Sequence, residues 1–209
     1  MTDNRIKKVV IFAGGKGTRL AEQTNLIPKP LVPIGPDPVL IHIMRHFYRA
    51  GYREFIIAVG YMSDEFKRYF RDYSLSKRDV IFTKYGMQVS DSEDVEDWVV
   101  NIVETGENST TGQRLNSVRR FLKPGETFFL TYGDSVSDVP LKKVEALHFS
   151  QPDNTVTITA INRTERFGIL RVNGDNKVAN FSEKSSASAE YINGGFIACD
   201  YSIFDEVSS

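Results

Sequence analysis

Apolar and polar positions along the chain follow two alternating patterns, one typical of strands and one typical of helices. The short apolar, β-branched runs at residues 8–13 and 55–59 are typical of buried strands. Between them, residues 38–50 have helical periodicity, with Pro38 in the first turn and Gly51 just past the end. Strands that alternate with helices of about 10–13 residues indicate βαβ units. We therefore expect an α/β fold, with a Rossmann-like, mostly parallel sheet flanked by helices.

The same alternation continues to the end of the chain. Residues 86–97 are polar and acidic, so we interpret them as an excursion at the surface, and Ser63 is expected to cap the helix that it begins. No repeat or low-complexity linker divides the chain, which predicts a single domain over residues 1–209. Further strands are expected at 80–82, 98–104, 127–132, 155–161, 167–172 and 191–198, and further helices at 63–69, 113–122, 141–149 and from Ser202 onward.

Composition and charge exclude several classes of protein. The 209 residues are 41% hydrophobic, enough for a substantial core. The 26 basic and 27 acidic residues do not provide the strongly basic surface of a nucleic-acid binder. No apolar run approaches the roughly 18–20 residues of a membrane span, and residues 9–13 are too short for a signal-peptide core. Cys199 is the only cysteine, so we expect a small core residue in a soluble, cytoplasmic protein.

Two of the expected strands end in glycine beside charged residues. In parallel sheets, ligands bind outside the carboxyl ends of the strands, so these ends are candidate sites. Residues 14–19 read Gly-Gly-Lys-Gly-Thr-Arg after the first strand, and Gly133-Asp134 follow a later one. Glycines allow close backbone approach, and the basic side chains suit a polyphosphate. The loop matches neither the Walker motif nor the dinucleotide fingerprint, and the glycines alone leave a plain tight turn open.

A longer sequence pattern that includes this loop points to one protein family. Residues 12–20, followed by Pro28-Lys29-Pro30-Leu31, resemble the signature of the sugar-1-phosphate nucleotidylyltransferases. Segments 98–106, 111–115, 131–134, 136–139 and 192–196 resemble one branch, the glucose-1-phosphate cytidylyltransferases. The resemblance runs in order from about residue 8 to residue 198 and implies the nucleotide-diphospho-sugar transferase type of fold. Members of the family continue beyond this length, so we expect a domain truncated at its C-terminus.

The resemblance implies transfer of a nucleotide. A sugar 1-phosphate, glucose 1-phosphate in this branch, attacks the α-phosphorus of CTP to give a CDP-sugar and pyrophosphate for a surface polysaccharide. The two anions repel each other, so Mg²⁺ and basic side chains are required. A homo-oligomer without nucleic-acid or membrane partners is expected. Two alternatives stay open: a uridylyl-, thymidylyl- or guanylyl-transferase, and a nucleotide or sugar-phosphate binding module without turnover.

The resemblance also assigns a role to each matching residue. Arg19 would hold the leaving phosphates, Lys29 would contact the α-phosphate, and Asp134 would bind Mg²⁺, as suits a carboxylate at a strand end. Ser135 stands where the branch has glycine, which leaves the sugar open. The expected nucleotide-binding residues are Phe12, Ala13, Gly14, Gly15, Gly17, Thr18, Arg19, Thr111, Arg114 and Gly133. The expected sugar-phosphate-binding residues are Glu183, Lys184, Asn193 and Gly194.

Overall fold

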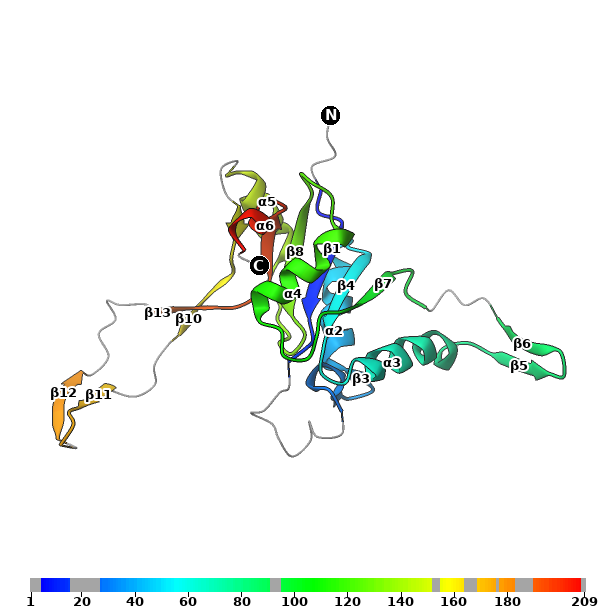
Figure 1. Ribbon diagram of the computed structural model, residues 1–209, viewed down its shortest axis with the longest axis horizontal. Helices are drawn as coiled ribbons and strands as arrows, with labels where there is room; N and C mark the ends of the chain where they lie inside the picture. Colours follow the sequence, from blue (N-terminus) through cyan, green and yellow to red (C-terminus); the bar gives the residue numbers. More distant parts are fainter. Residues whose placement is uncertain are drawn as a thin grey trace.

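The computed structural model describes residues 5–15, 27–90, 95–151, 155–163, 169–175, 177–182 and 190–207. At its centre lies a six-stranded sheet with the strand order β7-β4-β1-β8-β14-β9 (Figure 1). These strands are β1 (Lys8–Phe12), β4 (Glu54–Val59), β7 (Val99–Glu104), β8 (Thr127–Tyr132), β9 (Val156–Thr157) and β14 (Ile197–Asp200). The helices are α2 (Val39–Arg49), α3 (Ser63–Ser76), α4 (Thr111–Val118), α5 (Leu141–Phe149) and α6 (Ile203–Glu206).

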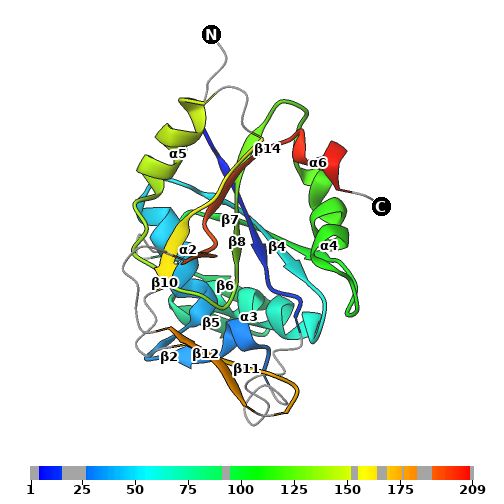
Figure 2. The same ribbon diagram turned by 90° about the vertical axis from the view of Figure 1, so that its left-hand side faces the viewer.

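Both faces of the sheet are buried. Val9 and Ile11 of β1 belong to an apolar cluster with α2, α3 and α5, whereas Val10 belongs to a second cluster with α4 and α6. Because successive strand residues point to opposite faces, an unbroken apolar run such as that of β1 requires cover on both sides. Figure 2 shows α2 and α5 on one side of the sheet and α4 and α6 on the other.

Most of the sheet is parallel, as predicted. Strand β1 pairs in parallel with both β4 and β8, and β4 pairs in parallel with β7, while β14 and β9 run antiparallel at one edge. Phe12 at the end of β1 is therefore in register with Tyr132 at the end of β8 and with Ala58 of β4. The carboxyl ends of these strands, which carry the candidate chemistry, meet at one edge of the sheet.

Two projections extend on opposite sides from the central sheet and the helices that cover it (Figure 1). One is a hairpin of β5 (Val80–Thr83) and β6 (Gly86–Val89). The other combines the pair β10 (Ala160–Arg163) and β13 (Glu190–Asn193) with the pair β11 (Ile169–Val172) and β12 (Val178–Ser182). The short elements β2 (Pro33–Ile34), β3 (Asp37–Pro38), η2 (Lys29–Leu31) and η3 (Arg119–Phe121) complete the described part of the fold.

Some local expectations are confirmed only in part, and others were wrong. The strand expected at 80–82 is present as β5, but it pairs with β6 outside the main sheet, and residues 86–89 of the expected surface excursion form β6. The strand expected at 191–198 is two strands, β13 and β14, separated by a bend in which Gly195 and Phe196 have positive φ angles of 71° and 49°. The strand expected at 155–161 is likewise divided into β9 and β10. Ser63 does not cap α3, whose N-cap is Met62 without a side-chain hydrogen bond.

Cys199 is a buried core residue of β14, as expected. Burial raises the pKa of its thiol to about 12, so it carries no reactive thiolate near neutral pH. Among the described residues, no helix combines the length and the apolar character needed to cross a membrane.

Candidate active site

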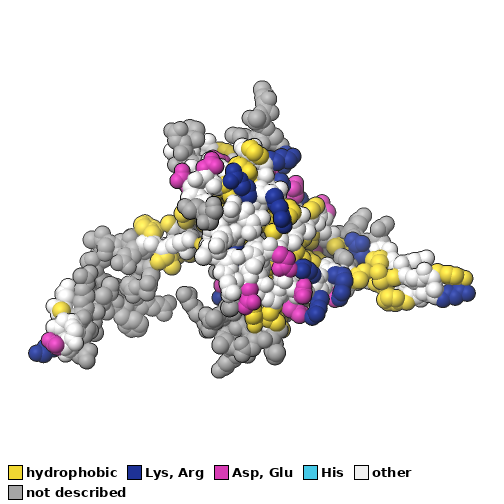
Figure 3. Space-filling model, in the orientation of Figure 1, with side chains coloured by type: hydrophobic (Ala, Val, Ile, Leu, Met, Phe, Trp, Pro, Cys, Tyr) yellow, Lys and Arg dark blue, Asp and Glu magenta, His cyan; other side chains and the backbone are white. Residues whose placement is uncertain are grey.

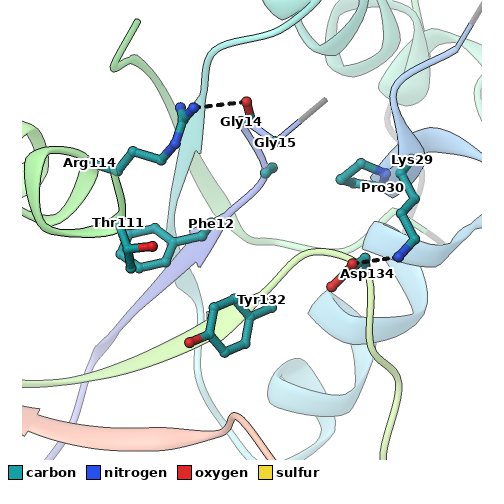
Figure 4. A pocket seen from close by; sticks show the side chains of 10 residues that line it. Phe12, Gly14, Gly15, Lys29, Pro30, Thr111, Arg114, Tyr132 and Asp134 are labelled. Atoms are coloured by element: carbon teal, nitrogen blue, oxygen red, sulfur yellow. Dashed lines mark hydrogen bonds and ion pairs between the residues drawn. The ribbon is translucent and has the colours of Figure 1, made fainter. Parts of the chain in front are cut away.

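A cavity of about 200 Å³ opens where β1 and β8 end (Figure 4). Its wall comes from four stretches of the chain that are far apart in sequence: the end of β1, the short helix η2, the start of α4 and the end of β8. The lining residues are Phe12, Ala13, Gly14, Gly15, Lys29, Pro30, Thr111, Arg114, Tyr132 and Asp134. All of them except Pro30 and Tyr132 were candidate site residues from the sequence.

The sheet brings the ends of β1 and β8 together. The Gly133 amide donates a hydrogen bond of 2.8 Å to the Phe12 carbonyl, and the Ala13 amide donates one of 2.9 Å to the Ala58 carbonyl. A Cβ atom at Gly133 would lie 3.1 Å from that carbonyl oxygen and 3.2 Å from Pro30 Cγ, tighter than ordinary contact. Gly133 thus lets β8 pass close to Pro30, and its amide is engaged in the sheet instead of lining the cavity.

Lys29 and Asp134 form an ion pair in the cavity wall. Lys29 Nζ donates to Asp134 Oδ2 at 2.6 Å, and the two side chains are 29% and 39% exposed. Lys29 begins η2, where it stands between Pro28 and the buried Pro30, so the flanking backbone has little freedom. A cation suited to a phosphate therefore lies beside a carboxylate suited to a hard metal ion, both within reach of a ligand.

Arg114 has a different setting, because its guanidinium is buried. It donates to Thr105 Oγ1 at 2.6 Å, to the Gly14 carbonyl at 2.9 Å and to the Glu107 carbonyl at 3.1 Å. All three acceptors are uncharged, and burial lowers the pKa of this guanidinium. Arg114 therefore cross-links the end of β1 to the loop that follows β7, in addition to lining the cavity.

Glycines make room for this buried guanidinium. A Cβ atom at Gly14 would lie 1.9 Å from Arg114 Nη1, and one at Gly60 would lie 2.5 Å from the same atom. The Gly60 Cβ would also lie 2.5 Å from the Gly106 carbonyl oxygen. Gly14 is thus required by packing against Arg114, a reason separate from ligand approach that the glycine-loop pattern did not reveal.

The start of α4 is fixed by a capping box. Thr110 Oγ1 accepts a hydrogen bond from the Gln113 amide, and Gln113 Oε1 accepts one from the Thr110 amide. The helix therefore begins at Thr111, on the cavity wall. A helix N-terminus attracts anions through its unpaired amides and its dipole. This arrangement adds a third feature suited to a phosphate beside Gly14 and Lys29.

Tyr132 links the cavity to the second projection. Asn193 Nδ2 donates to Tyr132 Oη at 3.4 Å, while Asn193 Oδ1 accepts from the Gly195 amide. The Gly194 amide donates to the Thr159 carbonyl, and a Cβ there would lie 2.8 Å from the Ile161 side chain. The expected sugar-phosphate segment around Asn193 thus adjoins the aromatic wall of the cavity.

The sequence reasoning missed Tyr132 although a signal was present. Tyr132 is the last residue of an apolar strand and directly precedes Gly133-Asp134, where an aromatic side chain reaches the ligand edge of the sheet. Five further candidates, Gly17, Thr18, Arg19, Glu183 and Lys184, lie outside the described residues.

The profile of one protein family, described as "Nucleotidyl transferase", matches residues 8–208. The chain belongs to this family. It is 40% identical over 204 residues to the glucose-1-phosphate cytidylyltransferases of Salmonella typhimurium and Salmonella typhi, an alignment that covers 97% of this chain and 78% of each relative. The predicted resemblance to this branch is confirmed.

Solved structures agree on the fold. The crystal structure of a UDP-glucose pyrophosphorylase complexed with UDP-glucose superimposes with a TM-score of 0.67 at 18% identity, over 98% of this chain and 80% of the other. At that level of identity the similarity shows the fold alone. It confirms the predicted α/β architecture, with a mostly parallel sheet flanked by helices.

Proposed function

We propose that this protein joins CTP and glucose 1-phosphate to give CDP-glucose and pyrophosphate. The observation that carries the proposal is the 40% identity, over 97% of the chain, to the glucose-1-phosphate cytidylyltransferase of Salmonella typhimurium. The structure supports it with a cavity at the strand ends in which Lys29, Asp134 and the start of α4 converge.

The proposed reaction needs no covalent enzyme intermediate. An oxygen of the sugar phosphate forms a bond to the α-phosphorus of CTP, and the bond from that phosphorus to the oxygen bridging to the β-phosphate breaks. The protein must hold the two phosphates in line and stabilise the negative charge that accumulates between them. Lys29 Nζ would donate to the α-phosphate oxygens, a contact that strengthens in the transition state. Arg19 would hold the departing pyrophosphate.

The rest of the cavity would position the nucleotide. Gly14 and Gly15 allow the backbone to approach the ligand, and Thr111 brings the N-terminus of α4 to it. Arg114 would act mainly through Gly14, whose carbonyl it holds. Tyr132 and Asn193, which contact each other, would separate the nucleotide side of the cavity from a sugar-phosphate side completed by Glu183 and Lys184.

Asp134 fits the expected Mg²⁺. The described residues contain no cluster of three or more His, Cys, Asp or Glu side chains that could hold a metal by themselves. Mg²⁺ does not require such a cage, because it retains several waters and is commonly bound by one or two carboxylates together with substrate phosphates. The partly exposed Asp134 carboxylate on the cavity wall offers a hard oxygen of this kind. The ion would neutralise phosphate charge when bound.

Several wider expectations stay predictions beside this proposal. They are a single domain over residues 1–209, a cytoplasmic location, a product used for surface polysaccharide, and assembly into a homo-oligomer.

Pyrophosphate release tests the proposal directly. The protein is mixed with Mg²⁺, one of five nucleoside triphosphates (CTP, UTP, dTTP, GTP or ATP) and one of a panel of sugar 1-phosphates. We expect CTP with glucose 1-phosphate to give the fastest release. Thermal shift should rank the same nucleotide first, since a ligand that binds only the folded state stabilises it by RT ln(1 + [L]/Kd). Preference for a purine nucleotide would reject the cytidylyltransferase assignment, and binding without release would favour a binding module.

A further inference from the structure

The paired strands β10 and β13 present two different faces. In their register, Ala160 lies opposite Asn193. Two positions further along the pair, Asn162 lies opposite Tyr191. Because paired residues share a side and the sides alternate along each strand, these four residues lie on the same face. We call them the polar face of the strand pair, and none of their side chains is charged.

The polar face is turned toward the cavity. Asn193 Nδ2 donates a hydrogen bond of 3.4 Å to Tyr132 Oη, and Tyr132 is part of the cavity wall (Figure 4). The pair Ile161–Ile192 lies on the opposite face. There the Ile161 side chain covers Gly194, where a Cβ atom would lie 2.8 Å from it. One face of the strand pair is thus directed at the candidate active site, and the other packs against the bend at its own base.

Tyr191 is the next residue of β13 on the polar face beyond Asn193. Strand residues rise about 3.3 Å each, so Tyr191 lies about 7 Å further along the strand, a step comparable to the width of a pyranose ring. Tyr191 is 66% exposed and makes no ring contact with another described residue, and Asn162 is also exposed. Figure 3 shows hydrophobic side chains gathered where this projection leaves the central sheet. A ligand that extends from the cavity past Tyr132 therefore meets an open aromatic ring and an amide.

These side chains suit the uncharged part of a sugar phosphate. Lys29 and Asp134 supply charge at the cavity for the phosphate end of the ligand, whereas the polar face supplies none. The flat ring of a tyrosine is apolar over its faces, so it can cover the C–H face of a pyranose and exclude water from it. An asparagine amide both donates and accepts hydrogen bonds, as a sugar hydroxyl does. An aromatic side chain with a few placed polar groups is a common lining of small-molecule sites.

We propose that Tyr191 and Asn162 bind the sugar ring of the hexose 1-phosphate and select which sugar the protein accepts. This inference rests on the function proposed above and adds two specificity-determining residues to it. With the phosphate held at the cavity, C1 of the sugar lies near Asn193, and C4, on the opposite side of the ring, points outward along the strand pair. Tyr191 then lies against the ring, and Asn162 hydrogen-bonds the hydroxyl at C4. Selection should therefore act on C4 and not on C2, which stays close to the phosphate.

Binding of the product tests the role of Tyr191. Isothermal titration calorimetry in Mg²⁺ compares CDP-glucose with CDP for the wild type, for Tyr191→Ala and for Ile192→Ala, which changes the opposite face of the same strand. We expect Tyr191→Ala to weaken binding of CDP-glucose by roughly three- to tenfold, the scale of one aromatic contact, and to leave binding of CDP unchanged. Ile192→Ala should change neither affinity. Tyr191→Phe, which retains the ring, should keep most of the affinity for CDP-glucose, and circular dichroism checks that each variant folds.

The outcomes separate this inference from the proposed function. If the wild type binds CDP-glucose and Tyr191→Ala binds it equally well, the inference is overturned and the proposed function stands. A wild type that does not bind CDP-glucose would overturn the proposed function, and this inference with it. Equal losses of affinity for CDP and CDP-glucose in Tyr191→Ala would place the effect at the nucleotide or in the fold, and would also overturn the inference.

Sugar selection tests the role of Asn162. Pyrophosphate release at saturating CTP gives kcat/KM for the 1-phosphates of glucose, of its C4 epimer galactose and of its C2 epimer mannose. We expect the wild type to prefer glucose to galactose, and Asn162→Ala to lower that preference by roughly three- to tenfold, the scale of one hydrogen bond. The preference for glucose over mannose and the KM for CTP should not change. An unchanged preference for glucose over galactose, or equal changes in both preferences, would overturn the role of Asn162.

Discussion

Lys29 Nζ lies 2.6 Å from Asp134 Oδ2 in the cavity wall, although the two residues are 105 positions apart in the chain. In the proposed reaction each group has another partner: a phosphate for Lys29 and Mg²⁺ for Asp134. A partly exposed ion pair contributes only about 0–1 kcal/mol, so ligands of higher charge can displace it. In the proposed reaction, the nucleotide and the metal ion would therefore replace this ion pair, which otherwise holds both side chains at the cavity.

Replacing Lys29 should impair the chemical step. We expect Lys29→Ala to lower turnover by on the order of 10²–10³-fold, the usual scale for losing one contact to developing charge. Folding should hardly change, because the side chain is partly exposed. Steady-state pyrophosphate release measures the effect, and Lys143→Ala on the exposed surface of α5 serves as a matched control. Turnover near that of the wild type in folded Lys29→Ala would remove this residue from the reaction.

Replacing Asp134 should separate metal-dependent from metal-free binding. In Asp134→Asn the metal ligand is lost, and Mg²⁺-dependent turnover should fall sharply. Metal-free CTP should bind more tightly than to the wild type, because a carboxylate that repels phosphate has gone and Lys29 has lost its ion-pair partner. Isothermal titration calorimetry with CTP, in EDTA and then in Mg²⁺, measures both quantities. Weaker binding in EDTA would show that Asp134 does not compete for Lys29.

Two adjacent glycines should differ in what they contribute to stability. A methyl group at Gly14 meets Arg114 Nη1 at 1.9 Å, whereas one at Gly15 meets no described atom within 4 Å. We expect Gly14→Ala to lower the free energy of unfolding by about 1–3 kcal/mol, since the buried guanidinium must shift. Gly15→Ala should stay within about 0.5 kcal/mol of the wild type. Urea denaturation of both variants gives the comparison. Equal losses of unfolding free energy in the two variants would mean that the Arg114 side chain shifts without destabilising the protein.

A polar network at the base of the hairpin should make stability depend on pH. Burial alone would raise the pKa of Glu96, but hydrogen bonds from Arg45, Tyr73 and Lys77 lower it to about 2. Because the pKa of Glu96 is lower in the folded protein, its carboxylate stabilises the fold at pH values above its ordinary pKa of 4.5. This contribution is lost as the pH falls toward 2. It amounts to on the order of 3 kcal/mol.

Glu96→Gln isolates this contribution. The variant should be less stable than the wild type at pH 7, and its free energy of unfolding should fall less steeply between pH 5 and pH 2 (about 1.4 kcal/mol is at stake per unit of pKa shift). Urea denaturation at a series of pH values supplies both curves. Parallel curves for the two proteins would show that Glu96 titrates alike in the folded and unfolded states.

The sequence by itself determined the class of fold and the family. Short, β-branched apolar runs such as residues 9–13 favour a strand covered on both faces, and their alternation with helical segments predicted a parallel sheet with helices on either side. The loop at residues 14–19, Lys29 between two prolines and Asp134 after a strand identified the ligand edge of the sheet. These features are local, and neighbouring residues decide them.

Only the tertiary structure decided what those residues contact. Arg114 was expected at the nucleotide, and it does line the cavity. That its guanidinium also donates to the Gly14 carbonyl, 100 positions away, depends on the packing of α4 against the sheet. The site around Tyr132 arises in the same way, since the register of β8 on β1 places its ring beside Phe12. Residues 86–97 were interpreted as a surface excursion. Within them, residues 86–89 form a strand because they pair with β5, and not because of local propensity. Contacts between distant segments depend on the order and register of the strands in the sheet, and a local sequence pattern does not encode them.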